Sequence, residues 1–347
     1  MKCTIVENSI KLEKPFSYFL GTLDALEYSK ITITDGDVSG VGEIVNSLDV
    51  NGQTQESVQS IEKVIATILS LGPATINSVE DIEYILGQIR LYLSFNAGVL
   101  CGVEQALFDI LAQKNNTSVL DLLGGEQGNL PKKIQITIPF LDDLNAYQSF
   151  FTDVIQVRKP DYVKFKIGKD LAVELEAIKM LADLTNISIS VDANQAFSNV
   201  DAAIEYANQL DTLGVAWAEQ LLVKDDLEGL KKLRKNTALP LMADEALHTL
   251  LEAEYFVQNN LVDYFNIKLA KTGGILEARK IIKFAKEHNI KYMLGSMLHG
   301  DIGIRYNLTC ALSEDFVTQD FFSYFSVSGT KDSGMVDDSL YIVKDLL

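Results

Sequence analysis

Two lysines lie two residues apart in the segment DYVKFKIGKD, which spans residues 161–170. The segment alternates polar and apolar residues as a strand does, so Lys164 and Lys166 share one face, while Val163 and Phe165 occupy the other. A lysine pair on a solvated edge strand opposes aggregation. In a polar cavity the same pair can exchange protons with a bound substrate. Which of these applies depends on the elements that position the strand.

Polar residues also end the strand-like segments that follow along the chain. They are Asp192 and Asn194, Glu219, Asp244 and Glu245, Lys268, Ser296, and Asp320. An acidic residue in such a place often caps the next helix, and we expect this role for Glu245. Carboxylates that end three successive strands can instead converge as the hard oxygen ligands that Mg²⁺ prefers. We therefore predict a metal site at Asp192, Glu219 and Asp244.

Strand and helix patterns alternate from about residue 129 onward. Eight short β-branched runs, from IQITIPF at 134–140 to FVTQDFF at 316–322, recur at near-equal spacing with helical segments between them. This alternation predicts a modified (β/α)₈ TIM barrel, whose active site lies at the C-terminal ends of the strands. A doubly wound sheet is the alternative, but it does not require eight near-equal units.

Lys166 and Lys268 fall on the second and sixth of these strands, so a barrel would place them opposite each other across its mouth. Two bases on opposite sides of a metal-bound carboxylate could remove a proton from one face of a carbon and return one to the other. A lysine in this role must be neutral part of the time. We expect the neighbouring Lys164 ammonium and the divalent cation to lower the pKa of Lys166.

The first part of the chain follows a different pattern. KITITDGDVSGVGEIV, at 30–45, predicts an antiparallel hairpin, and three helical patterns follow it. We therefore expect an α+β domain over residues 1–128 and the catalytic barrel over residues 129–322. The remaining residues, 323–347, have no barrel partner left and are expected to return to the first domain.

The composition restricts the class of partner. The 347-residue chain carries 30 basic and 48 acidic residues, a net charge of −18, which disfavours nucleic acid or an anionic membrane. Three scattered cysteines indicate neither a disulfide framework nor a zinc site, and fit a reducing compartment. The chain shows no signal-peptide pattern and no apolar stretch long enough to span a membrane. We expect a cytoplasmic protein that binds a small molecule.

The order of these motifs resembles the enolase superfamily, in particular its muconate-cycloisomerase-like subgroup. The resemblance covers nearly the whole chain and rests on VKFKIG, VDANQAF, AEQ, ADEAL, IKLAKTGGI and LGSM. It implies an α+β capping domain formed by the N-terminal segment and the C-terminal tail, and a homo-oligomer. It also implies one Mg²⁺ per subunit on the three carboxylates, an enolate stabilised by that metal, and Lys166 and Lys268 as the acid–base pair.

Within this subgroup the chain is most similar to the dipeptide epimerases, the relatives of L-Ala-D/L-Glu epimerase. In that family an acidic pair after the eighth strand holds the α-ammonium of the dipeptide. Asp320 matches the first acid, while Phe322 occupies the place of the second. Gly21 stands where the family has an arginine for an anionic side chain, and Tyr18, Phe19 and Leu20 are expected to line an apolar or mixed side-chain pocket in its place. The resemblance therefore implies a side-chain preference that is not strictly for glutamate.

Several further roles follow from the same resemblance. His299 replaces a glutamate of the relatives, and it is expected either to face solvent at a helix start or to contact the substrate. Substrate contacts are also expected from Thr137, Ser296 and Met297. Asn194 and Glu245 are expected to support the metal ligands from behind.

Three functions are compatible with these residues. The first is a Mg²⁺-dependent epimerase that transfers a proton at the α-carbon of the C-terminal residue of a dipeptide. The second is a lyase or cycloisomerase, such as o-succinylbenzoate synthase or muconate cycloisomerase, but its anionic substrate would gain nothing from the Asp320 carboxylate. The third is a non-catalytic protein on the same scaffold. A non-catalytic protein would be expected to have lost the acid–base residues. The set is complete in this sequence, so we favour the epimerase.

Overall fold

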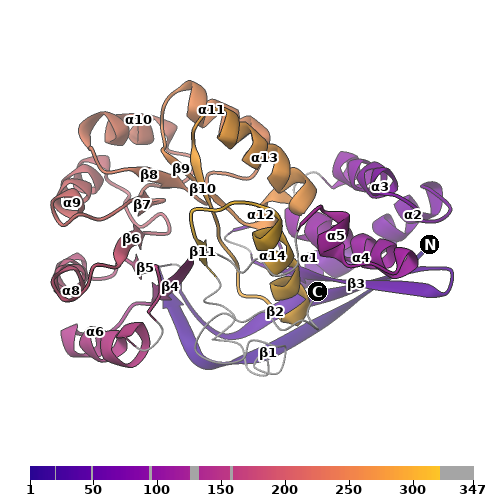
Figure 1. Cartoon of the computed structure of the whole chain (residues 1–347), viewed down its shortest axis with the longest axis horizontal. Helices are drawn as coiled ribbons and strands as arrows, with labels where there is room; N and C mark the ends of the chain where they lie inside the picture. The colour runs from indigo at the N-terminus through magenta and orange to yellow at the C-terminus, as the bar shows by residue number, and fades with distance from the viewer. Residues whose placement is uncertain (20, 48–49, 94–95, 126–132, 157–158, 321–347) are drawn as a thin grey trace.

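A computed structural model describes residues 1–19, 21–47, 50–93, 96–125, 133–156 and 159–320 (Figure 1). Its N-terminal part is built on a three-stranded antiparallel sheet, in the order β1 (Lys2–Tyr18), β2 (Gly21–Asp35) and β3 (Val38–Val45). A tight turn at Gly36, where φ is 65°, joins β2 to β3. The predicted hairpin at 30–45 is thus confirmed.

Helices cover one side of this sheet. They are α1 (Gln55–Ser60), α2 (Glu62–Leu71), α3 (Val79–Tyr92), α4 (Ala97–Asn115) and α5 (Val119–Leu122). Gly40 and Gly42 let α4 approach β3 closely, because a Cβ atom at either position would lie within 2.0 Å of a carbonyl oxygen of α4. The helical patterns predicted for this part of the chain are confirmed. None of the helices in the described ranges combines the length and apolarity that a membrane-spanning helix needs.

The second part of the chain is a closed barrel of eight parallel strands, which confirms the predicted fold. In chain order the strands are β4 (Ile134–Ile138), β5 (Tyr162–Lys166), β6 (Ser188–Asp192), β7 (Ala218–Glu219), β8 (Leu241–Ala243), β9 (Tyr264–Ile267), β10 (Lys291–Leu294) and β11 (Gln319–Asp320). Because β5 pairs with β4 on one side and β6 on the other, it is not an edge strand. The solvated-edge explanation of the lysine pair is therefore wrong.

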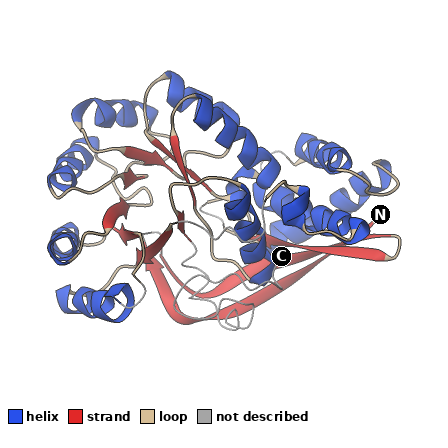
Figure 2. Cartoon of the chain, in the orientation of Figure 1, coloured by secondary structure: helices blue, strands red, loops and turns tan. Residues whose placement is uncertain are grey.

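Helices form a ring outside the barrel (Figure 2). They are α6 (Leu144–Phe150) with the π-turn η1 (Phe151–Ile155), α8 (Leu171–Leu184), α9 (Val200–Thr212), α10 (Leu227–Asn236), α11 (Leu250–Gln258), α12 (Leu269–Thr272), α13 (Ile275–Glu287) and α14 (Asp301–Ser313). On β5 the outward-facing Val163 and Phe165 are fully buried against this ring. The strand alternation inferred for residues 161–170 therefore separates an apolar helix-facing side from a polar interior side.

The barrel interior is apolar at one end and polar at the other. Trp217, Met242, Tyr264 and Met293 pack together around the starts of their strands, and the rings of Trp217 and Tyr264 stack with centroids 5.0 Å apart. This plug closes the N-terminal end of the barrel. The polar side chains at the opposite strand ends share a cavity with residues of the N-terminal domain.

Two buried carboxylates of the N-terminal domain bind the first turns of barrel helices. Glu43 on β3 accepts hydrogen bonds from the backbone N–H groups of Gly300 and Gly303 at the start of α14, at 3.0 and 3.1 Å. Glu104 on α4 accepts from the N–H groups of Ile275 and Leu276 at the start of α13. These hydrogen bonds satisfy backbone N–H groups that a helix leaves unpaired at its start, so they fix the N-terminal domain over the barrel.

Glu104 is expected to make the stability of the protein depend on pH. Burial raises its pKa to about 7, although the Tyr306 hydroxyl and two backbone N–H groups donate to it. The folded state therefore binds more protons than the unfolded chain between about pH 4.5 and about pH 7, and the free energy of unfolding falls as pH rises through that range. Relative to the Glu104→Gln variant, the wild type should lose on the order of 1–3 kcal/mol between about pH 5 and about pH 8.

Chemical denaturation of both proteins at the two pH values measures this difference. The matched control is Glu83→Gln on α3, because Glu83 is exposed and its removal should leave the pH dependence as it is in the wild type. Equal pH dependence in the wild type and the Glu104→Gln variant would show that Glu104 does not titrate in this range.

We retain the proposed division into residues 1–128, 129–322 and 323–347. The last segment, which is expected to return to the N-terminal domain, lies outside the described residues.

Candidate active site at the barrel mouth

Three carboxylates converge at the polar end of the barrel. Asp192 ends β6, Glu219 ends β7 and Asp244 directly follows β8, and all three are fully buried. One oxygen atom from each lies within 4.8 Å of the others. Since β6, β7 and β8 are neighbours in the barrel, the closed sheet itself brings these side chains together.

The negative charge of this cluster is poorly balanced at Glu219. Burial and the nearby Asp192 carboxylate raise the pKa of Glu219 to about 8. Burial also opposes ionisation of Asp244, but Lys268 and Lys271 hold the pKa of that carboxyl well below its usual range. Three oxygen donors of like charge at this spacing form a set that suits a hard divalent cation. The chain therefore has a buried acidic triad able to bind a metal.

Two lysines approach the triad from opposite walls of the barrel. Lys166 Nζ on β5 lies 2.6 Å from Asp192 Oδ2 and also donates to Asn194 Oδ1 at 2.6 Å. Lys268 Nζ, directly after β9, lies 2.6 Å from Asp244 Oδ2. In the closed strand order β5 and β9 are separated by three strands on either side, so they face each other across the barrel. This is the arrangement that the strand count predicted.

Lys164 has a different environment from the one expected. Its Nζ lies 2.9 Å from Asp320, 3.4 Å from Glu219 and 3.7 Å from Asp192. Burial disfavours its ammonium, but these three carboxylates hold the pKa of Lys164 well above its usual value. Lys164 is therefore held as an ammonium that balances the charge of the acidic cluster. Its expected effect on Lys166 stays a prediction.

Second partners hold the triad in place. Asn266 on β9 donates to Glu219 Oε1 at 2.6 Å, and Lys271 on α12 donates to Asp244 Oδ1 at 2.5 Å. Gln220 has a left-handed backbone, with φ at 40°, and its side-chain oxygen accepts from the Asp244 N–H. Left-handed non-glycine residues tend to occur at functional sites. Sequence reasoning missed all three, although the spacing of Lys271 from Lys268, one helical turn, was an available signal.

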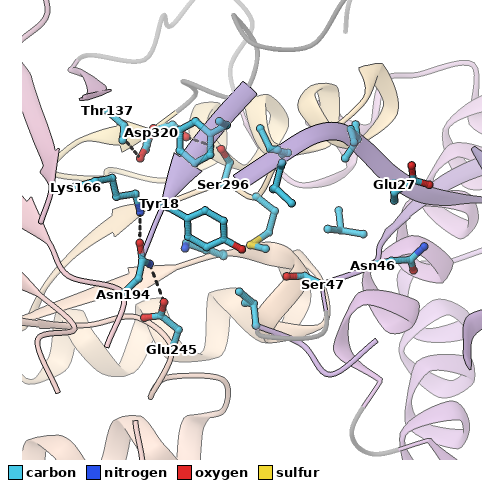
Figure 3. Close-up of a pocket in the computed structure, with 18 of the residues that line it drawn as sticks. Tyr18, Glu27, Asn46, Ser47, Thr137, Lys166, Asn194, Glu245, Ser296 and Asp320 are labelled. Carbon is cyan, nitrogen blue, oxygen red and sulfur yellow. Dashed lines mark hydrogen bonds between the residues drawn. The ribbon is translucent and has the colours of Figure 1, made fainter. Parts of the chain in front are cut away.

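A cavity of about 250 Å³ opens above the lysines (Figure 3). Its barrel side is polar and includes Thr137, Lys164, Lys166, Asn194, Glu245, Lys268, Ser296 and Asp320. The N-terminal domain and the loop after β10 supply mostly apolar walls, namely Phe16, Tyr18, Leu23, Ala25, Leu26, Val45, Val50, Met297 and Leu298, together with Glu27, Asn46 and Ser47. We call the barrel side, which carries the lysines, the floor of the cavity. We call the side formed by the N-terminal domain and the loop after β10, which is mostly apolar, its upper part.

Asp320 is fixed within this cavity by its neighbours. Thr137 Oγ1 donates to Asp320 Oδ2 at 2.9 Å, and Ser296 Oγ donates to the Asp320 carbonyl at 2.7 Å. The structure therefore brings together Asp320, Thr137, Ser296 and Met297 at one cavity, as the predicted substrate contacts require.

Glu245 does not have the helix-capping role that we expected. The cap of α11 is Thr249, whose side chain accepts from the Glu252 N–H. Glu245 is instead buried and accepts from Asn194 Nδ2 at 2.8 Å. Burial and the charges of Asp244 and Asp192 raise its pKa to about 7. Glu245 thus links to Lys166 through Asn194, a position that fits a supporting role behind the metal ligands.

The expectation that His299 faces solvent is wrong. His299 is buried, with 2% of its surface exposed, so it does not face solvent. It is not among the described residues that line the cavity either. Its Nδ1 lies 2.9 Å from Glu43 Oε1, the same carboxylate that binds the start of α14. His299 therefore connects the loop that carries Ser296 and Met297 to the N-terminal domain.

The hairpin tip of β1 and β2 also differs from the expectation. Phe19 is 41% exposed, and neither Phe19 nor Gly21 belongs to the described cavity lining; Tyr18 and Leu23 do. Tyr18 pairs with Gly21 at the tip, and the Phe19 ring lies beside Gly168, just after β5. Leu20 and Phe322 lie outside the described residues.

Known proteins share this architecture. Residues 1–124 match the family described as mandelate racemase / muconate lactonizing enzyme, N-terminal domain, and residues 152–343 match enolase C-terminal domain-like proteins. The L-Ala-D/L-Glu epimerase of Bacillus subtilis is 32% identical over 92% of this chain and 87% of its own length.

Solved structures agree with these matches. A substrate-liganded complex of the L-Ala-D/L-Glu epimerase from Bacillus subtilis superposes with a TM-score of 0.85 at 28% identity, over 95% of this chain and 92% of the other. A dipeptide epimerase from Enterococcus faecalis, complexed with Mg and the dipeptide L-Leu-L-Tyr, gives 0.84 at 25% identity, over 94% and 91%. This chain therefore belongs to the enolase superfamily, with the N-terminal domain of the mandelate racemase and muconate lactonizing enzymes.

Proposed function

We propose that this protein is a Mg²⁺-dependent epimerase of dipeptides that transfers a proton at the α-carbon of the C-terminal residue. The observation that carries the proposal is the pair Lys166 and Lys268 on opposite walls of the barrel, each 2.6 Å from a carboxylate of the buried triad. Relatives named as dipeptide epimerases, one of them complexed with Mg and a dipeptide, support the choice of substrate and metal.

The chemistry divides between the metal and the two lysines. Asp192, Glu219 and Asp244 would hold Mg²⁺, which when bound would draw negative charge from the substrate carboxylate and make the α-proton more acidic. One lysine, as the neutral amine, accepts the α-proton from its side of the carbon. The other, as the ammonium, donates a proton to the opposite face, which inverts the configuration.

Asn194 and Glu245 hold Lys166, one of the two bases, in a fixed position. Asn194 accepts from Lys166 through Oδ1 and donates to Glu245 through Nδ2, so its amide orientation is fixed by both contacts. These two hydrogen bonds, from Lys166 to Asn194 and from Asn194 to Glu245, hold the Lys166 ammonium at the polar side of the cavity. A base held in one place needs less reorganisation at the moment of proton transfer.

Asp320 supplies the site for the α-ammonium of the dipeptide. Its carboxylate faces the cavity, held by Thr137 and Lys164. An ammonium of the substrate would add a charge-assisted hydrogen bond to this carboxylate. The apolar upper walls then receive the side chains of the dipeptide, and we propose that the second residue is not strictly glutamate.

Incubation with a library of dipeptides in D₂O with Mg²⁺ tests the function directly. Each turnover replaces the α-proton of the C-terminal residue with deuterium, so mass gain at that carbon reports the reaction without knowledge of the preferred side chain. We expect exchange for dipeptides with several different second residues. Exchange of L-Ala-L-Glu alone would contradict the proposed side-chain preference, and exchange of none would contradict the function.

Replacement of Asp320 by asparagine separates a dipeptide epimerase from a lyase or cycloisomerase of the same subgroup. We expect a loss of about 10²-fold or more in kcat/KM for a dipeptide, because the substrate ammonium loses a buried charged partner. An N-acetylated dipeptide, which has no ammonium, should be a poor substrate of both wild type and variant, to the same degree.

The control for this measurement is Asp315→Asn, which removes an exposed charge shortly before β11. Full dipeptide turnover by the Asp320→Asn variant would contradict the assignment of Asp320 to the substrate ammonium, which is the feature that argues against a lyase or cycloisomerase.

A further inference from the structure

The upper part of the cavity is acidic as well as apolar. The two segments of the N-terminal domain that form it, around residues 16–27 and 45–50, contain no lysine, arginine or histidine in the sequence. The lysines among the described lining residues, Lys164, Lys166 and Lys268, all belong to the barrel side. The charged residue that the N-terminal domain contributes to this lining is Glu27. An anionic side chain of a substrate would therefore meet no opposite charge from these segments.

Glu27 lies at the far end of the cavity from the catalytic lysines. In Figure 3, Glu27 and Asn46 are on one side of the lined space, and Lys166 and Asn194 are on the other. Ser9 Oγ donates to Glu27 Oε1 at 2.6 Å and Gln55 Nε2 donates to Oε2 at 2.9 Å. Both donors are neutral, so they hold the carboxylate in position without cancelling its charge.

Asn46 lies at the same end of the cavity as Glu27 (Figure 3). Its side-chain oxygen is buried, and its Nδ2 donates to Ser29 Oγ at 3.2 Å. Glu27 is therefore the charged acceptor at this end. A carboxylate there matches a ligand group that has N–H donors and a positive charge.

Between this end and the lysines the walls are hydrocarbon. Phe16, Leu23, Leu26, Val45 and Val50 line the path. Lysine and arginine side chains combine an apolar stem with a cationic end, so they pack along such walls while the charged group reaches a polar partner. The net charge of −18 also favours a cationic substrate, because it disfavours the approach of a substrate with an extra negative charge.

We infer that the upper end of the cavity, at Glu27 and Asn46, selects a dipeptide whose second residue has a long cationic side chain, lysine or arginine. The inference rests on the dipeptide epimerase activity proposed above. It assigns Glu27 a role in specificity and none in proton transfer.

The test compares kcat/KM for four dipeptides, L-Ala-L-Arg, L-Ala-L-Lys, L-Ala-L-Met and L-Ala-L-Glu, in the full-length Mg²⁺-loaded protein. For the wild type we expect the two cationic substrates to exceed L-Ala-L-Glu by about tenfold or more. In the Glu27→Gln variant the ratio of L-Ala-L-Arg to L-Ala-L-Met should fall about fivefold, mainly through KM, and less at high salt because the contact is near solvent.

Asp24→Asn is the matched control. Asp24 is an exposed acid on the same strand, outside the described cavity lining, and its replacement changes the net charge by the same amount. The control should keep the wild-type ratio. Equal ratios in the Glu27→Gln and Asp24→Asn variants would overturn the inference, as would a wild-type preference for L-Ala-L-Glu.

Two further outcomes are distinguishable. If L-Arg-L-Ala, and not L-Ala-L-Arg, depended on Glu27, the assignment to the second residue would be wrong. If the dipeptides exchanged their α-protons but the ratio of L-Ala-L-Arg to L-Ala-L-Met stayed the same in the Glu27→Gln variant, the specificity inference would fail while the proposed function stood. Failure of all four dipeptides to exchange would instead remove the proposed function itself.

Discussion

Lys166→Met and Lys268→Met are each expected to reduce the kcat for epimerisation by about 10³-fold or more, since removal of a general acid or base commonly costs 10²–10⁴-fold. Both side chains line the cavity and lie against the triad from opposite walls, at 2.6 Å from Asp192 and Asp244 respectively. In a two-base reaction neither lysine can replace the other, because each serves one face of the α-carbon. Circular dichroism or chiral chromatography of the product measures the loss.

Arginine at position 166 separates charge from proton transfer. An arginine remains protonated at any accessible pH, so Lys166→Arg keeps the positive charge near Asp192 but cannot act as a base. We expect it to be as inactive as Lys166→Met. The control is Lys169→Met, three residues further along the chain, where the side chain is 58% exposed. Substantial activity in the Lys166→Arg variant would mean that position 166 supplies charge alone.

Removal of the metal is expected to have an effect of similar size. Treatment with EDTA should abolish exchange of the α-proton, and added Mg²⁺ should restore it. Glu219→Gln should give a loss on the order of 10³-fold that Mg²⁺ restores only in part, because the triad then offers two charged ligands in place of three.

Thermal unfolding supplies a readout of metal binding that does not depend on activity. A saturating metal ion stabilises the folded state by about 2.7 kcal/mol at a concentration 100 times its Kd, so Mg²⁺ should raise the Tm of the wild type by several degrees. The shift should be smaller in Glu219→Gln and unchanged in the control Asp211→Asn, which is exposed on α9. No Mg²⁺-dependent shift in the wild type would contradict a metal site at this triad.

The barrel and its triad could be predicted because they depend on a repeated local pattern. Eight strand-like runs at even spacing determine the fold, and closure of the sheet then brings the ends of successive strands together. Asp192, Glu219 and Asp244 needed no further information, since β6, β7 and β8 are adjacent both in sequence and in space. The same reasoning placed Lys166 and Lys268 on opposite walls.

Contacts between the two parts of the chain could not be predicted in this way. His299 and Glu43 are 256 positions apart, and their contact exists only because the N-terminal domain docks on the start of α14. The positions of Phe19 and Gly21 depend on the register of the β1–β2 hairpin, which shifts between Lys11 and Phe16. No local pattern in the sequence records either the docking or the shift.

Glu245 illustrates a third limit. An acid just after a strand can cap the following helix or turn into the barrel, and both are common. Neighbours in space decide between them: Thr249 caps α11, and Asn194, two residues after β6, donates a hydrogen bond from its amide to Glu245. Lys164 is similar, since the strand pattern places it on the inner face but does not reveal that three carboxylates surround it.

The central claim is that Lys166 and Lys268 serve opposite faces of one α-carbon. Proton NMR in D₂O, with L-Ala-L-Met and L-Ala-D-Met offered separately to Lys166→Met and Lys268→Met, tests it most directly. Each variant keeps one base, so it should exchange the α-proton of one epimer without inverting it, and the two variants should exchange opposite epimers. Exchange of the same epimer by both variants, or of both epimers by one, would contradict the two-base account.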